Sequence, residues 1–399
     1  MPDMASRTLT VPIVARPANA ASAGVVSVEW YVWAAVLGVT SSTVGLYWDI
    51  CWHMSIGRDT FWTPAHIAIL FGSVLTSLLC AYLIVRTTFG ADATAKETSV
   101  RIWGFRGPMG AFIGVWGTFL MLEMFPFDNW WHSAFGLDVK ILTPPHSVGI
   151  SGIFFMGFGG LVLLASRMNL SLGETNKQLN WLLMYLGALL LSDLVILGFQ
   201  YIGDQTVMHS AIFYMAVGLV GPLVLVGVNR ASGQRWAATK VASLYMALWL
   251  AAEWILPLFP AHARLGPVFT PITHMVPMGF PVLLAPGGVV LDYLCNHFSH
   301  KGKWLQALVA GSGFLLTMVA VQWPFAIFLV SPYARNWVFG ANYFRYSIPP
   351  SEYHYRWEFV SYESSQAQLW IGMFIVWLAT IFSTRVGLFW GEWLRRMRR

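Results

Sequence analysis

Long apolar stretches separated by short polar loops fill most of the sequence after residue 27. A helix that crosses the hydrocarbon core of a membrane needs about 20 mainly apolar residues, and by this criterion we expect about ten spanning helices. The seventh, eighth and ninth are interrupted by Pro, Glu or His. The expected helices cover residues 28–48, 63–86, 109–127, 144–166, 179–200, 208–229, 238–258, 268–291, 304–330 and 367–390. The pattern predicts an all-α, polytopic transmembrane helix bundle.

Composition supports a membrane protein. Apolar residues make up 57% of the chain and charged residues 11%, whereas a soluble domain is about a quarter charged. The net charge of +6 does not indicate nucleic-acid binding, because no expected helix carries a Lys/Arg face. The cysteines Cys51, Cys80 and Cys295 form no spacing motif and say little about the redox compartment.

Basic residues between the expected helices set the orientation. They follow the second, fourth, sixth and eighth helices, on the side that also holds both termini. The positive-inside rule assigns this side to the cytoplasm. Residues 1–27 lack the apolar run of a signal peptide, so we expect a cytoplasmic tail.

An internal repeat places the same polar residues at two helix ends. The first copy reads YWDICWHMSIGRDTFWTPAHIAI and the second reads PFDNWWHSAFGLDVKILTPPHSVGI. Both keep Asp, Trp-His, Gly-x-Asp, Thr-Pro and a final His in the same order. The shared positions are Asp49, Trp52, His53, Gly57, Asp59, Thr63, Pro64 and His66, and Asp128, Trp131, His132, Gly136, Asp138, Thr143, Pro144 and His146.

The spacing in the first copy predicts a metal site. Asp49 and His53 are four residues apart and therefore share one face of a helix. Thr63 suits an N-cap and Pro64 the first helical position, which puts His66 in the first turn of the next helix. One carboxylate and two imidazoles then meet at a helix–loop–helix corner. Such ligands suit copper, zinc or iron, with an open position for water, oxygen or substrate.

The second copy repeats this geometry at the end of the third expected helix. Asp128 and His132 share a face, and His146 follows Thr143 and Pro144 in the first turn of the fourth helix. His, Trp and Asp at a membrane interface also serve as anchors and caps. The repetition favours ligation over that structural role, since ionisable residues at membrane depth are costly and tend to be functional. We interpret Asp59 and Asp138 as supporting the loops or orienting a histidine.

Other polar residues leave more than one role open. His209, which follows Asp204, could join a site or cap a helix, and His274 lies near a Pro-broken helix and could line a cavity. For Glu253, Asp204 and Asp292 we favour hydrogen bonds between helices. Four further histidines are expected in loops or at the interface rather than as ligands: His262, His297, His300 and His354.

The segments WDICWH and RDTFWTPAHI resemble the C subunit of the copper membrane monooxygenases, the particulate methane and ammonia monooxygenases. That subunit has an Asp-x-x-x-His pair followed by an RDT…TP-x-HI stretch, and its next ligand cluster holds an Asn, a His and a later His. Later segments resemble the A subunit: LNWLLMYLGALLL, GDQTVM, Ala252-Glu253-Trp254, FTPITHMVPMGFPVLLAPGGVVLD, QWPFAIFLVSP and RYSIPPSEYHYRWE. The chain is thus similar to a C-like half, residues 28–170, joined to an A-like half, residues 175–399, at the polar segment 168–178.

The resemblance implies copper at one corner and a neighbouring metal site at the other. Their ligands would be Asp49, His53 and His66, and Asp128, His132 and His146. Asp128 stands where the family has Asn, which adds a negative charge and a harder ligand, so zinc or iron stays open there. The A-like half lacks the family's His-x-His, and this chain has no cupredoxin-like domain.

The resemblance also implies a function and partners. We expect O2 activation and hydroxylation of a small apolar substrate, in an inner (cytoplasmic or intracytoplasmic) membrane. The partners would be the lipid bilayer, further copies of the chain, as a trimer, and a soluble cupredoxin-like subunit. A non-catalytic metal-handling protein and a structural membrane subunit are the alternatives. A transporter is disfavoured because the repeat is direct rather than inverted.

Overall fold

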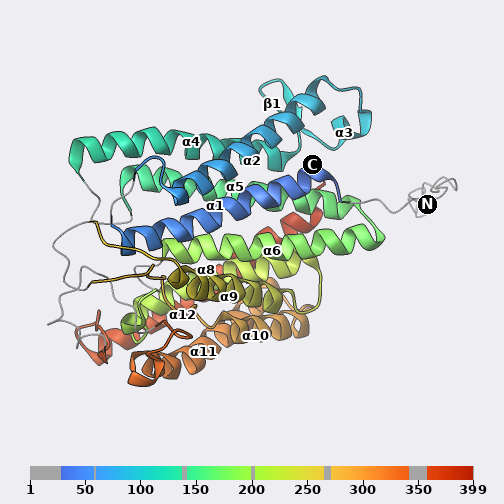
Figure 1. Ribbon diagram of the computed structural model, residues 1–399. Coiled ribbons are helices and arrows are strands. Elements are labelled where there is room, and N and C mark those ends of the chain that lie inside the picture. Colours follow the sequence, from blue (N-terminus) through green and yellow to red (C-terminus); the bar gives the residue numbers. More distant parts are fainter. Residues whose placement is uncertain are drawn as a thin grey trace, which may run out of the picture.

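The computed structural model describes residues 28–57, 60–136, 142–198, 203–264, 271–340 and 357–398. It is an all-α bundle (Figure 1), in which eight of the described helices are long and apolar enough to cross a membrane. The elements are α1 Trp30–Ser55, α2 Pro64–Phe89, α3 Ala93–Glu97, β1 Val100–Ile102, β2 Phe105–Gly107, α4 Met109–Phe135, α5 Pro144–Leu170, α6 Gly173–Leu197, η1 Gln205–Val207, α8 Ala211–Ser232, α9 Ala237–Ile255, η2 Leu256–Leu258, α10 Leu284–His297, α11 Lys303–Val330, η3 Pro332–Ala334 and α12 Gln366–Arg396. The protein is therefore a multi-pass membrane protein.

The start of α1 and the end of α12 both lie near the end of α5, at one end of the bundle. Arg167 at the end of α5 pairs with Glu29 before α1 at 3.6 Å. Asn169 Nδ2 donates to the carbonyl oxygens of Leu394 at 2.9 Å and Met397 at 2.7 Å, near the end of α12. Figure 1 shows the α1–α2 and α4–α5 connections at the opposite end. The assignment of one end to the cytoplasm stays a prediction.

Two of the ten expected spans differ from the structure. α1 is 26 residues long and packs on α2, α5 and α6, but it is not among the eight helices that are apolar enough to cross a membrane. The expected helix at 268–291 is wrong in its described first part, because residues 271–283 are not helical and α10 begins at Leu284. Pro271, Pro277 and Pro281 remove backbone donors and clash with a continuous helix.

Buried side chains support the non-helical segment that precedes α10. An unpaired N–H group in an apolar interior costs several kcal/mol. Three backbone N–H groups of the segment avoid this cost, because they donate to side chains of other helices. The bonds run from Val276 N to Ser55 Oγ at 2.7 Å, from Gly279 N to Glu253 Oε2 at 3.2 Å, and from Leu283 N to Gln322 Oε1 at 3.1 Å. α1, α9 and α11 thus hold irregular backbone inside the bundle.

The two halves inferred from the sequence share their interior. α5 ends at Leu170 and α6 begins at Gly173, so a two-residue turn joins them. Val32 of α1 and Leu183 of α6 belong to one buried apolar cluster, which also includes Leu394 of α12. The boundary near residues 168–178 stays a prediction, and the halves pack as one bundle.

Asp292 connects three helices through its buried carboxylate. Its oxygens accept bonds from Asn229 Nδ2, from the backbone N–H groups of Ala238 and Thr239, and from Thr239 Oγ1. The carboxylate therefore caps the start of α9. The predicted hydrogen bonds between helices are confirmed for Asp292. Asp204 has a local role instead, since it caps η1 through Thr206.

Replacing Asp292 with Ala should lower the free energy of unfolding by about 2–4 kcal/mol, because four donors lose a buried acceptor. Metal content should not change. Unfolding in detergent micelles measures the effect, with Asp92→Ala as the control. Asp92 is exposed and caps the short α3 through Ala95 N, so its loss should cost about 1 kcal/mol or less. Equal losses in the two variants would contradict this role of Asp292.

Candidate metal centres

The first corner lies where α1 ends and α2 begins. Gly57 has a φ of 80°, which a glycine adopts without strain, and Pro64 opens α2 after Thr63. The corner brings together the three residues predicted from the sequence. Asp49 Oδ1 lies 3.1 Å from His66 Nε2, and Asp49 Oδ2 lies 3.7 Å from His53 Nε2. The carboxylate therefore sits between the two rings.

The second corner repeats this arrangement between α4 and α5. α4 continues past Pro126 to Phe135, beyond the expected end at 127. Asp128 Oδ2 lies 3.5 Å from His132 Nε2, and Asp128 Oδ1 lies 3.4 Å from His146 Nε2. In each corner, one ligand atom from every residue lies within 4.8 Å of the others. Gly136 has a φ of 84°, as its counterpart in the first corner does.

Backbone carbonyls orient one histidine of each corner. His66 Nδ1 lies 2.9 Å from the carbonyl oxygen of Thr60, and His132 Nδ1 lies 3.0 Å from that of Gly136. A ring nitrogen that faces a carbonyl carries the proton, so the lone pair of a neutral ring is on Nε2. That lone pair faces the carboxylate oxygen of Asp49 or Asp128. Two acceptors this close require either a proton or a metal ion between them, and the donor set of each corner fits a metal ion.

Both corners are partly open at the end of the bundle. The side chain of Asp49 is 15% exposed and that of His66 is 11% exposed, whereas His53 is 36% exposed. In the second corner, His146 at 26% is the most exposed of the three. An ion could therefore reach each triad through its exposed side, where water or another ligand would complete the coordination.

The two corners are neighbours in the bundle. The ring of His66 packs edge-on against Phe125 at 5.6 Å between centroids, and Phe125 lies one turn before Asp128 on α4. α2 packs on α4, and α1 packs on α5. His146 also interacts electrostatically with Asp49. Charge at one corner therefore influences the other.

His209 does not join either corner. Its ring stacks between Trp323, at 4.0 Å between centroids, and Phe359, at 3.6 Å. Nε2 faces the carbonyl oxygen of Trp323 at 2.9 Å. Burial lowers the pKa of His209, although the bond to that carbonyl raises it. The residue packs the loop before α8 against α11, so the alternative of a site ligand is not supported.

The other histidines lie outside the two described clusters. His274 is exposed, forms a β-bridge with Pro260 and contacts Thr273 Oγ1 through Nδ1 at 2.9 Å, and its role in lining a cavity stays a prediction. His262, His297 and His300 are exposed, as expected. Asp59, Asp138, His354 and the tail 1–27 lie outside the described residues.

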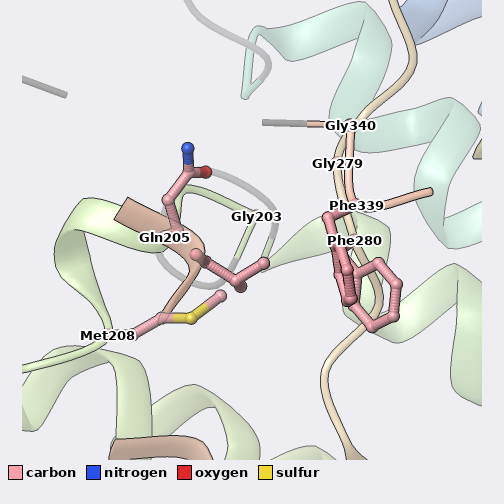
Figure 2. A pocket seen from close by; sticks show the side chains of 8 residues that line it. Gly203, Gln205, Met208, Gly279, Phe280, Phe339 and Gly340 are labelled. Carbon is pink, nitrogen blue, oxygen red and sulfur yellow. The ribbon is translucent and has the colours of Figure 1, made fainter. Parts of the chain in front are cut away.

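A separate pocket opens near the connection between α6 and α8. Figure 2 shows Gln205 and Met208 on one side and the rings of Phe280 and Phe339 on the other. Those two rings lie 5.2 Å apart between centroids. The remaining lining residues are Gly203, Gly279, Leu329 and Gly340. None of the six candidate ligands lines this pocket, so it is distinct from the metal centres.

No protein-family model, curated protein or solved structure matches this chain. The metal centres are therefore argued from the geometry of their own residues. Similarity to the copper membrane monooxygenases, and the substrate and partners that it implies, therefore remain a proposal.

Proposed function

We propose that the protein is a membrane-bound, copper-dependent monooxygenase-like protein that activates O2 and hydroxylates a small apolar substrate. The observation that supports metal binding most strongly is the pair of acceptors Asp49 Oδ1 and His66 Nε2, 3.1 Å apart, with His66 Nδ1 turned to a carbonyl. The second corner repeats it with Asp128, His132 and His146. Mixed nitrogen and oxygen ligands suit copper, with zinc and iron as competitors.

The side chains around the first corner have separable roles. Asp49 would offset the charge of the ion, and the Thr60 carbonyl would hold His66 in its ligating orientation. Copper, when bound, would supply the redox chemistry with O2 that side chains cannot. Phe61 and Phe125, whose rings lie 5.7 Å apart, would exclude water on the bundle side of His66.

An apolar cluster beside the corners offers an approach for a membrane-soluble substrate. Its buried members come from α2, α4 and α5 and include Ile69, Met121, Phe125, Ile153 and Met156. These buried side chains would present an apolar surface, rather than charged groups, to a small apolar molecule beside the first corner. The arrangement therefore favours a hydrocarbon-like substrate over a polar one.

Product formation tests the proposal. The purified protein, loaded with copper or with zinc, is given a quinol reductant, a short-chain alkane and 18O2. We expect labelled alcohol from the copper form and none from the zinc form, with the product abolished in His66→Ala. Full copper loading without labelled product, with the soluble cupredoxin-like partner absent or supplied, would overturn catalysis while leaving metal binding intact.

A metal-handling protein is the second candidate, and the exposure of His53 and His146 favours it. Open ligands at a membrane surface suit uptake and release of an ion. Rapid transfer of copper to a soluble acceptor, without O2 consumption, would support this function. If chelation leaves stability unchanged and no metal binds, the motifs are helix caps of a structural subunit. The trimer and the inner (cytoplasmic or intracytoplasmic) membrane also remain proposals.

Asp128→Asn should change metal preference at the second corner. The amide removes a negative charge, so we expect zinc to bind at least about tenfold more weakly, with a smaller loss for Cu(I). Competition titrations with a chromophoric chelator measure both affinities, and the exposed neighbour provides the control variant Asn129→Ala. Equal affinities before and after Asp128→Asn would show that Asp128 is not a ligand.

A further inference from the structure

A second polar region lies behind α1, on the face opposite Asp49 and His53. One buried stripe on α9 consists of residues spaced by four, namely Tyr245, Trp249 and Glu253. Tyr47 of α1 faces this stripe, and its ring meets that of Trp249 edge-on at 5.1 Å between centroids. Tyr245 contacts Trp249 at 5.5 Å. We call these four residues the α1–α9 seam.

The seam contains four buried polar atoms that make no hydrogen bond of ordinary geometry to the described residues, although the backbone of Met278 approaches Tyr47 and that of Val282 approaches Tyr245. They are Tyr47 Oη, Tyr245 Oη, Trp249 Nε1 and Glu253 Oε1. Tyr245 and Glu253 are completely buried, and Tyr47 is 6% exposed. Buried polar groups are nearly always bonded to protein or ordered water, and a buried water needs two to four polar partners. The seam has enough such atoms to hold a water, and ring contacts with Trp249 join Tyr47 and Tyr245.

Glu253 is also a buried ionisable group, so its charge matters. Its Oε2 accepts the N–H of Gly279 at 3.2 Å, while the ion pairs of the described residues do not include it. Its titratable neighbours Tyr47 and Cys51 are neutral in their ordinary protonated forms. An isolated buried carboxylate is very costly, and protonation removes that cost.

We propose that the α1–α9 seam is a buried water-binding site in which Glu253 holds a proton. Water bridges Glu253 Oε1 to the hydroxyl groups of Tyr47 and Tyr245 and accepts the indole N–H of Trp249. The inference rests on these residues and not on the metal chemistry.

The seam adjoins the pocket of Figure 2. Gly279 lines that pocket and also donates its N–H to Glu253. Gly279 therefore lies between water in the pocket and the proton on the Glu253 carboxyl group. On the other side, the thickness of α1, about 10 Å with side chains, separates the seam from the first metal corner. The site therefore holds an exchangeable proton close to that corner.

Infrared spectroscopy of the metal-free protein tests the proton. We expect a carbonyl stretching band of a protonated carboxylic acid that shifts in D2O and is lost in Glu253→Gln. The amide keeps an oxygen for Gly279, so the fold should persist, and a melting curve checks this. Glu392→Gln, which removes a carboxylate paired with Lys303, should leave the band. The variant Asp193→Asn identifies any band that comes from Asp193, a buried acid on α6. Retention of every carboxylic-acid band in Glu253→Gln would overturn the proton assignment.

Radiolytic hydroxyl-radical labelling of the wild-type protein tests the water without any variant. Radicals form from water next to the side chain that they modify, so Tyr245 and Trp249 should be labelled despite their burial. The controls are Met121 and Met184, which are fully buried and carry an intrinsically more reactive sulfur. If Tyr245 and Trp249 are labelled no more than these two methionines, the seam is dry and the proposal is wrong.

Discussion

Replacing His53 or His132 with Ala should remove one metal ion per chain from the affected corner and leave the other corner loaded. Each histidine directs Nε2 at the central carboxylate of its own triad, at 3.7 Å and 3.5 Å, and a two-ligand site binds far more weakly. Even the loss of an outer-shell partner costs about 10- to 100-fold in affinity. Elemental analysis of the purified variants, singly and combined, measures the stoichiometry.

His297→Ala provides the matched control for this experiment. His297 is exposed and stacks on Tyr293 at 5.8 Å between centroids, so its removal should leave metal content unchanged. If both corner variants keep the metal content of the wild type, neither triad binds the ion and the proposed function falls with it.

A second large effect is expected at the contact between α4 and α5. A Cβ atom at Gly117 would lie 2.5 Å from the backbone nitrogen of Met156 and 2.8 Å from the carbonyl oxygen of Gly152. Backbone cannot move aside as a flexible side chain can, so Gly117→Ala should force the helices apart. We expect a loss on the order of 3 kcal/mol and loss of metal at the second corner, since Asp128 and His146 come from these two helices.

Retention of metal at the first corner would separate this local effect from general unfolding. Gly302→Ala is the control, because a Cβ atom there meets no heavy atom within 4 Å. Gly117→Ala with wild-type stability and two bound ions would show that the α4–α5 contact tolerates the added methyl group.

The geometry of the two corners was predictable because its signals are local. Asp49 and His53 share a helix face by spacing alone, and Thr63-Pro64 marks the start of the next helix, so only a short loop had to close. The repetition in the second copy compensated for the weakness of a single motif. Gly57 and Gly136 mark the left-handed turns that close both corners.

Features that depend on contacts between distant segments were not predicted. The stripe of Tyr245, Trp249 and Glu253 has helical spacing, but its partner Tyr47 lies on α1, almost two hundred residues earlier. His209 showed the same limit, because its stacking partners Trp323 and Phe359 come from elsewhere in the chain. The short β1–β2 hairpin also went unnoticed, since its strands are too brief for an alternating pattern.

The segment before α10 was misassigned for a related reason. The segment is as apolar on average as a spanning helix. Average hydropathy takes no account of a backbone N–H donor that a proline lacks. Pro271, Pro277 and Pro281 together were the signal that a continuous helix was disfavoured. What the segment does instead depends on Ser55, Glu253 and Gln322, which reach it from three other helices.

That segment also bears on how the chain is assembled in the membrane. Its backbone cannot enter the lipid as an independent unit, because the amides of Val276, Gly279 and Leu283 obtain their acceptors from other helices. α1 and α9 precede it during synthesis, but Gln322 follows it. The segment can therefore complete its hydrogen bonds only after α11 has been synthesised, which makes the docking of the segment against α11 a late step of assembly. Because Ser55 lies two residues beyond His53, that step also completes the wall behind the first corner.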